Sequence, residues 1–89
     1  MRRSELNYIK GMNRIINIVA QTSHHSSVQR QMNEIVDIVF NDEGLGLENE
    51  FVAIYNEIKR CWELYIGDWD NKTEHAFEKA LRMNKIDTQ

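Results

Sequence analysis

The sequence contains no proline, and only four glycines occur among its 89 residues. Proline and glycine are the residues that most often end a helix or form a turn. Gly44 and Gly46 follow one segment with helical spacing of apolar residues, and Gly67 follows another, where a glycine readily ends a helix. A chain with so few breaks favours long helices over strands and tight turns.

Apolar residues recur at steps of three or four along four segments, which is the spacing of a helix with one buried side. The predicted helices cover about residues 4–21, 27–40, 47–66 and 71–84. The third segment gives the clearest signal, because its apolar residues fall within an arc of about 120°. These residues are Leu47, Phe51, Ile54, Tyr55, Ile58, Cys61, Trp62 and Tyr65. Since the loops are short, the expected fold class is all-α: a small four-helix bundle or an irregular four-helix domain.

Length and composition predict a single helical domain over residues 1–89, since chains of this size rarely divide. Hydrophobic residues make up 42% of the chain and charged residues 28%, which is the balance of a globular domain. No apolar run is long enough to span a membrane, so we expect no membrane contact. The single cysteine excludes an internal disulfide, and the expected localisation is cytoplasmic.

Two capping patterns are expected to start helices. Ser26 with Gln29 precedes the second apolar segment, and Asn71 with Glu74 precedes the fourth. In such a capping box, the first side chain accepts a hydrogen bond from a backbone N–H of the first turn, and the second side chain reaches back.

The formal net charge of −3 is distributed unevenly along the chain. Residues 1–30 carry five basic and one acidic side chain, residues 31–70 two basic and ten acidic, and residues 71–89 four basic and three acidic. The middle of the chain therefore presents an acidic surface, behind a basic leading helix.

No arrangement of residues predicts catalysis, a cofactor or a metal site. His24 and His25 are adjacent in a polar loop, where their side chains are expected to diverge, whereas zinc requires three or four converging ligands. Cys61 lies in the apolar arc of the third segment and is expected to be buried. The serines beside the histidines are better explained as helix caps than as nucleophiles. We therefore expect a protein that is not an enzyme.

Nucleic-acid binding is the alternative function, through a basic stripe on the first helix and the start of the second. Lys and Arg side chains there could neutralise phosphates. The candidate residues are Arg2, Arg3, Lys10, Arg14 and Arg30. The acidic middle of the chain would repel DNA, which counts against this interpretation.

Protein binding is the favoured function, and the stretch "GDWDN" at residues 67–71 is its centre. Trp69 lies beyond Gly67, outside any helical stripe, and could either fold back as a lid over the bundle end or anchor an interface. Flanking carboxylates would attract a basic partner. The predicted partner-binding residues are Trp69, Asp68, Asp70, Glu63, Leu64, Asp42 and Glu43.

In size, acidity and helical architecture, the chain resembles bacteriocin immunity proteins and small phage-encoded inhibitors of host enzymes. The resemblance implies a bacterial or phage protein that inhibits or regulates a partner without catalysis of its own. The acidic surface predicts that this partner has a basic surface, as the phosphate-binding groove of a nucleic-acid enzyme does. The wide apolar stripe of the first helix also leaves room for a homodimer.

Overall fold

The computed structural model describes residues 13–41 and 51–86. Residues 13–21 are helical and lead into a short 3-10 helix. The elements that follow are η1 (Thr22–His24), α2 (Val28–Asn41), α3 (Phe51–Tyr65) and α4 (Asn71–Met83). No strand occurs in the two described ranges, and the all-α prediction is confirmed.

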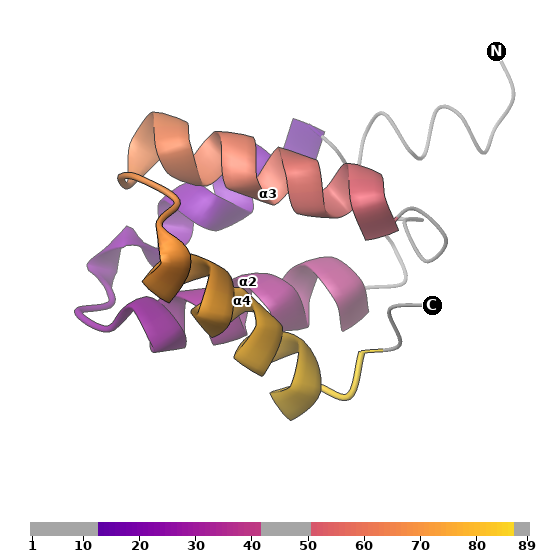
Figure 1. The fold of residues 1–89 in the computed structure, drawn as a ribbon. Coiled ribbons are helices and arrows are strands. Elements are labelled where there is room, and N and C mark those ends of the chain that lie inside the picture. Colours follow the sequence, from indigo (N-terminus) through magenta and orange to yellow (C-terminus); the bar gives the residue numbers. More distant parts are fainter. Residues whose placement is uncertain (1–12, 42–50, 87–89) are drawn as a thin grey trace, which may run out of the picture.

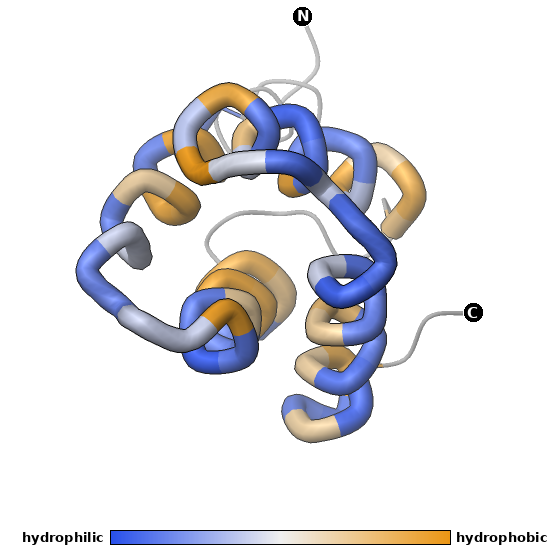
Figure 2. Tube along the Cα trace, turned by 60° about the vertical axis from the view of Figure 1, so that its left-hand side comes forward, coloured by the Kyte–Doolittle hydropathy of each residue, from blue (hydrophilic) through white to orange (hydrophobic). Residues whose placement is uncertain are grey.

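The helices enclose one core. Figure 1 shows α3 lying across α2 and α4, and α4 packs most closely on α2. Figure 2 shows hydrophobic and hydrophilic residues alternating along each helix, as expected of amphipathic helices that share a core. The buried residues are Ile15, Ile18, Val19, Met32, Ile35, Val36, Val39, Ile54, Ile58, Cys61, Trp62, Ala76, Phe77, Ala80 and Leu81. In the described part of each predicted segment, most of the apolar stripe is therefore buried as expected.

Tyr65 differs from its prediction, because 57% of its surface is exposed although it belongs to the apolar arc of α3. It is the last residue of α3, where the chain turns toward α4. At this height none of the described helices covers the apolar side of α3. Periodicity gives the direction of a side chain around a helix, but not whether a neighbour is present at that height.

The start of α2 differs from the predicted capping box. Ser27, rather than Ser26, takes the cap position, and its Oγ accepts a long hydrogen bond of 3.4 Å from the backbone N–H of Arg30. The Gln29 side chain does not bond to the backbone N–H of the cap residue, because its amide donates to the carbonyl of Ala76 on α4 at 2.9 Å. A hydrogen bond between α2 and α4 has replaced the expected one within the first turn of α2.

The start of α4 also differs by one residue. Asp70 is the N-cap, and its carboxylate accepts hydrogen bonds from the backbone N–H of Thr73 at 2.9 Å and from the Thr73 hydroxyl at 2.8 Å. These hydrogen bonds lower the pKa of Asp70 below its ordinary value of 3.8. Asn71 is the first helical residue, and Glu74 contacts α3 instead of capping the helix.

The predicted helix ends at 21, 40, 66 and 84 agree with the structure to within about one residue, the usual uncertainty of such boundaries. The predicted starts at residues 4 and 47 lie outside the described residues. Within residues 13–41 and 51–86, no helix is both long and apolar enough to cross a membrane.

Candidate functional site

Trp69 packs onto the core from the turn between α3 and α4. Its ring meets Trp62 nearly edge to face, with ring centroids 5.9 Å apart and an interplanar angle of 88°. It meets Tyr55 in the same manner at 6.1 Å and 79°, and Phe77 lies 5.9 Å away. Edge-to-face pairs at these separations add to the stabilisation from burial alone. Trp69 therefore closes one end of the core as a lid.

The indole nitrogen of Trp69 is enclosed as well. Nε1 is buried and has no hydrogen-bond partner among the described residues. It lies close enough to the Tyr55 hydroxyl to lower the pKa of that phenol slightly, against larger effects that raise it. Of the two roles that the sequence left open for Trp69, the packing supports the lid. Trp69 is half-buried against the core, whereas its neighbours Asp68 and Asp70 are exposed.

A hydrogen bond from Tyr55 to Glu74 ties α3 to α4 beside this lid. The phenol of Tyr55 donates to Oε1 of Glu74. This hydrogen bond, together with burial and the charge of Glu74, raises the pKa of Tyr55 from 10.0 to about 12. The carboxylate of Glu74 is thus committed to a contact inside the molecule.

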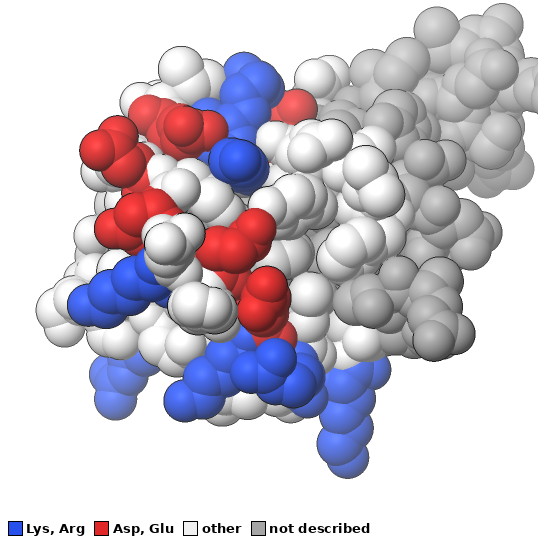
Figure 3. All heavy atoms as spheres, viewed as in Figure 1, with Lys and Arg blue, Asp and Glu red and all other residues white. Residues whose placement is uncertain are grey.

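The carboxyl end of α3 exposes apolar and acidic side chains together. Leu64 is 59% exposed and Tyr65 57% exposed, between the exposed carboxylates of Glu63 and Asp68. We call these four residues the α3 tip. Figure 3 shows carboxylates gathered over the end of α3, the following turn and α4, with several Lys and Arg side chains along the lower edge. Asp70 is exposed nearby, and Asp42 and Glu43 lie outside the described residues.

A basic groove between the start of α2 and α4 was missed from the sequence. It is open to solvent, with a volume of about 820 Å³, and three basic side chains, Lys72, Lys79 and Arg82, outnumber the one acidic side chain, Glu78, in its lining. Ser26, Ser27, Gln29 and His75 also line it. The basic residues share one side of α4 because Lys72, Lys79 and Arg82 are seven and three residues apart. That spacing was visible in the sequence, but the serines that face it come from a distant segment.

The candidate nucleic-acid residues on the first helix are only partly covered by the described ranges. Arg14 and Arg30 are exposed, whereas Arg2, Arg3 and Lys10 lie outside them. Neither Arg14 nor Arg30 lines the basic groove.

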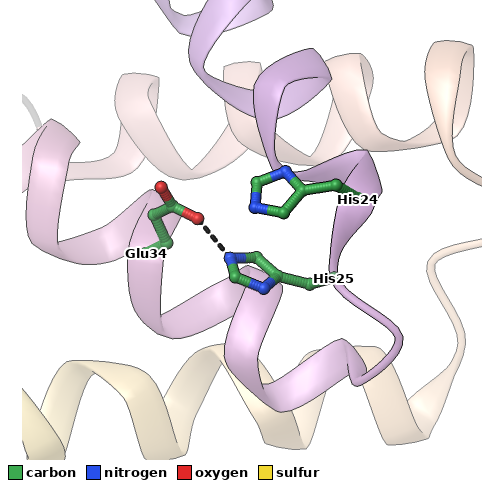
Figure 4. A group of neighbouring side chains, drawn as sticks. All are labelled: His24, His25 and Glu34. Atoms are coloured by element: carbon green, nitrogen blue, oxygen red, sulfur yellow. Dashed lines mark hydrogen bonds and ion pairs between the residues drawn. The ribbon is translucent and has the colours of Figure 1, made fainter.

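His24 and His25 do not diverge as the sequence predicted. Their ring centroids are 4.1 Å apart, and Figure 4 shows both rings facing Glu34 of α2. His24 ends the 3-10 turn, whereas His25 is extended, with φ −73° and ψ 136°. Because the backbone conformation changes between them, the usual angular separation of neighbouring side chains does not apply.

These three side chains form one group, which we call the histidine cluster. Nε2 of His25 lies 2.5 Å from Oε2 of Glu34, and Nδ1 of His24 lies 2.6 Å from the carbonyl oxygen of Gln21. One ligand atom from each of His24, His25 and Glu34 lies within 4.8 Å of the others. This is the group, among the described residues, whose geometry could hold a metal ion.

The backbone beneath the histidine cluster is fixed by two buried polar residues. The hydroxyl of Thr22 donates to the carbonyl of Val19 at 2.7 Å. The Gln31 amide donates to the carbonyl of Thr22 at 3.0 Å, and so joins η1 to α2. Both side chains are buried, where each hydrogen bond matters because its loss leaves polar groups unsatisfied.

Cys61 is unsuited to nucleophilic chemistry. It is buried as predicted, and its thiol lies 3.5 Å from Oε1 of Glu57. Burial first, and the nearby Glu57 charge second, raise the pKa of Cys61 from 9.0 to about 11. Arg60 donates to Glu57 and holds the pKa of that carboxyl below its ordinary value. The thiolate needed for catalysis is therefore strongly disfavoured.

Comparison with models of known protein families, with curated proteins and with solved structures finds no match to this chain.

Proposed function

We propose that this protein binds a partner protein with a basic surface through the α3 tip, and regulates that partner by occupying its surface, without catalysis of its own. The observation that carries the proposal is the exposure of Leu64 and Tyr65, two consecutive residues at the end of α3, with exposed carboxylates before and after them in the sequence. The anchoring role moves from Trp69, which packs onto the core, to these two side chains.

The apolar part of the α3 tip supplies affinity. A leucine and a tyrosine that are each more than half exposed leave apolar surface in water that a partner can bury. Tyrosine is enriched at binding hot spots, because its ring is large and rigid and its hydroxyl can form a hydrogen bond.

The acidic part of the α3 tip selects the partner. The carboxylates of Glu63 and Asp68 flank the apolar pair, and Figure 3 shows further acidic side chains around the following turn. Such an arrangement accelerates association with a positively charged surface and disfavours an acidic one. A basic, phosphate-binding groove of a nucleic-acid enzyme has the matching charge.

The test compares capture of proteins from a bacterial lysate by the wild type and by the Leu64→Ser/Tyr65→Ser double variant, after nuclease treatment. A protein retained by the wild type is identified, purified and titrated against both forms. We expect the double variant to bind it at least tenfold more weakly, which is about 1.4 kcal/mol. Affinity should also fall as salt is added, because Glu63 and Asp68 contribute charge.

Val52→Ser provides the matched control. Val52 lies on the same helix and is 68% exposed, so it offers the same kind of surface at the other end of α3. The proposal fails if Val52→Ser weakens binding as much as the double variant does, or if no protein distinguishes the wild type from the double variant.

The basic groove supports a second candidate function, nucleic-acid binding. Lys72, Lys79 and Arg82 line the groove and could contact phosphates. A labelled oligonucleotide titrated at two salt concentrations tests this function. Lys79→Gln/Arg82→Gln should weaken binding and flatten its salt dependence, whereas Lys59→Gln, outside the groove, should not.

A further inference from the structure

We propose that the histidine cluster is a binding site for a divalent transition metal of the zinc class, with His24, His25 and Glu34 as ligands. Two imidazoles and one carboxylate are a donor set found in three-ligand zinc sites and in non-haem iron sites. Such sites leave at least one coordination position open to water or to another ligand.

His24 is already oriented as a ligand. Its Nδ1 lies 2.6 Å from the carbonyl oxygen of Gln21, and a carbonyl can only accept, so Nδ1 carries the proton. Nε2 is then left with its lone pair, and the ring points toward His25 and Glu34 (Figure 4). A backbone carbonyl that fixes the opposite nitrogen is the usual support of a metal-binding histidine.

His25 and Glu34 supply the other two ligands after small rotations of their side chains. Tetrahedral ligands at roughly 2.0–2.2 Å from zinc lie about 3.3 Å from one another. The 2.5 Å contact between His25 Nε2 and Glu34 Oε2 must therefore lengthen by about 0.8 Å, while the widest separation between ligand atoms, up to 4.8 Å, shortens. The metal takes the place of the proton between these two atoms. That proton moves to Nδ1 of His25 or to solvent.

The cluster is supported by the fold. The Gln31 amide holds η1 against α2 from within the core, so the two histidines are held over the helix that carries Glu34. The Thr22 hydroxyl fixes the turn itself by donating to the carbonyl of Val19. His25 and Glu34 are half-buried, which limits competition from water, while the exposed His24 leaves a path for the ion to enter. Three ligands on two elements held together in this way require little ordering when the ion binds.

The experiment titrates the untagged, full-length protein with Zn²⁺ in a calorimeter, and with Co²⁺ followed by its visible absorption. We expect one ion per chain, and absorption of the intensity that four- or five-coordinate cobalt gives. His24→Ala and His25→Ala should each weaken Zn²⁺ binding at least tenfold, and Glu34→Gln should also weaken it. Zn²⁺ should raise the thermal midpoint of the wild type, and a chelator should reverse the rise.

His75→Ala is the matched control, since His75 is the remaining histidine of the chain and lies exposed on α4, outside the cluster. It should bind Zn²⁺ as the wild type does. Circular dichroism checks that each variant is folded, which is expected of His24→Ala because that side chain is exposed. Absence of one-to-one binding at about 100 μM Zn²⁺, or equal losses in His75→Ala and His24→Ala, would overturn the proposal.

Discussion

The two described connections between helices are held to the core in opposite ways. The turn from Ile66 to Asp70 is fixed by one large apolar side chain, because Trp69 folds back onto Trp62, Tyr55 and Phe77. The connection from Thr22 to Ser27 is fixed by polar groups, because the Gln31 amide reaches up from α2 to the Thr22 carbonyl.

This difference decides which side chains remain available for chemistry. In the α3–α4 turn, Trp69 is used for packing and is half-buried, and its neighbours Asp68 and Asp70 are exposed. In the first connection the buried contacts fall on Thr22, so the histidines that follow it can face outward and toward Glu34. Where a connection is held through its backbone, as at Thr22, its other side chains remain available for binding. Where it is held through a side chain, as at Trp69, that side chain does not.

Removal of the apolar anchor should have the largest effect. Trp69→Ala should lower the free energy of unfolding by about 3 kcal/mol, since it leaves a cavity between three aromatic rings, although the half-buried indole moderates the loss. Urea unfolding followed by circular dichroism measures the change.

Leu64→Ala is the control for the Trp69 substitution, because this exposed residue should change stability by less than about 0.5 kcal/mol. An unfolding midpoint of Trp69→Ala equal to that of the wild type would contradict the lid and restore Trp69 as a candidate interface residue.

Removal of the polar anchor should have a smaller effect on stability. Gln31→Leu keeps a similar volume but removes the amide that donates to the Thr22 carbonyl, at a cost of about 1 kcal/mol. The Thr22 carbonyl keeps its hydrogen bond from the His25 backbone, which limits the loss. Urea unfolding gives this value as well.

Gln31→Leu should also weaken Zn²⁺ binding, because η1 is no longer held against α2. Arg30→Leu, at an exposed neighbouring position, should change neither property. If Gln31→Leu bound Zn²⁺ as tightly as the wild type, the histidine cluster would not depend on this anchor, and the contrast between the two connections would weaken.

Much of this architecture could be predicted from the sequence, because the helices are strongly amphipathic and proline is absent. The site was harder to predict. From the sequence, Gln29 and Glu74 were expected to complete capping boxes, but both side chains contact other helices instead. The convergence of His24 and His25 depends on a change of backbone conformation between them, and the position of Glu34 depends on how η1 packs on α2. Neither leaves a periodic signal in the sequence.

High pH should loosen the packing of α3 against α4 around Tyr55. The pKa of Tyr55 is 10.0 ordinarily and about 12 in the folded protein, so folding favours the protonated phenol. The resulting stabilisation is complete below pH 10.0 and is lost as the pH rises through about 12. Ultraviolet difference titration should show one tyrosine ionising near pH 12.

Glu74→Gln tests the cause of the raised pKa of Tyr55. It removes the charge that faces the phenol, so the titration of Tyr55 should move back toward 10.0. A titration curve unchanged by Glu74→Gln would show that the phenol is not held by this carboxylate.

Gly67 should matter least, although it lies in the same turn as Trp69. A Cβ atom at this position meets nothing within 4 Å, and the backbone is not in the left-handed region. Gly67→Ala should therefore stabilise the protein by about 0.5 kcal/mol, by restricting the unfolded chain. A lower thermal midpoint for Gly67→Ala than for the wild type would show that the turn depends on this glycine as well as on Trp69.

The perpendicular contact between Trp62 and Trp69 also determines what light can report about this molecule. Both tryptophans of the chain lie at one end of the core, with ring centroids 5.9 Å apart. Their emission and their coupled near-ultraviolet dichroism arise from that end alone. Opening of the α3–α4 turn can therefore be followed without any added label.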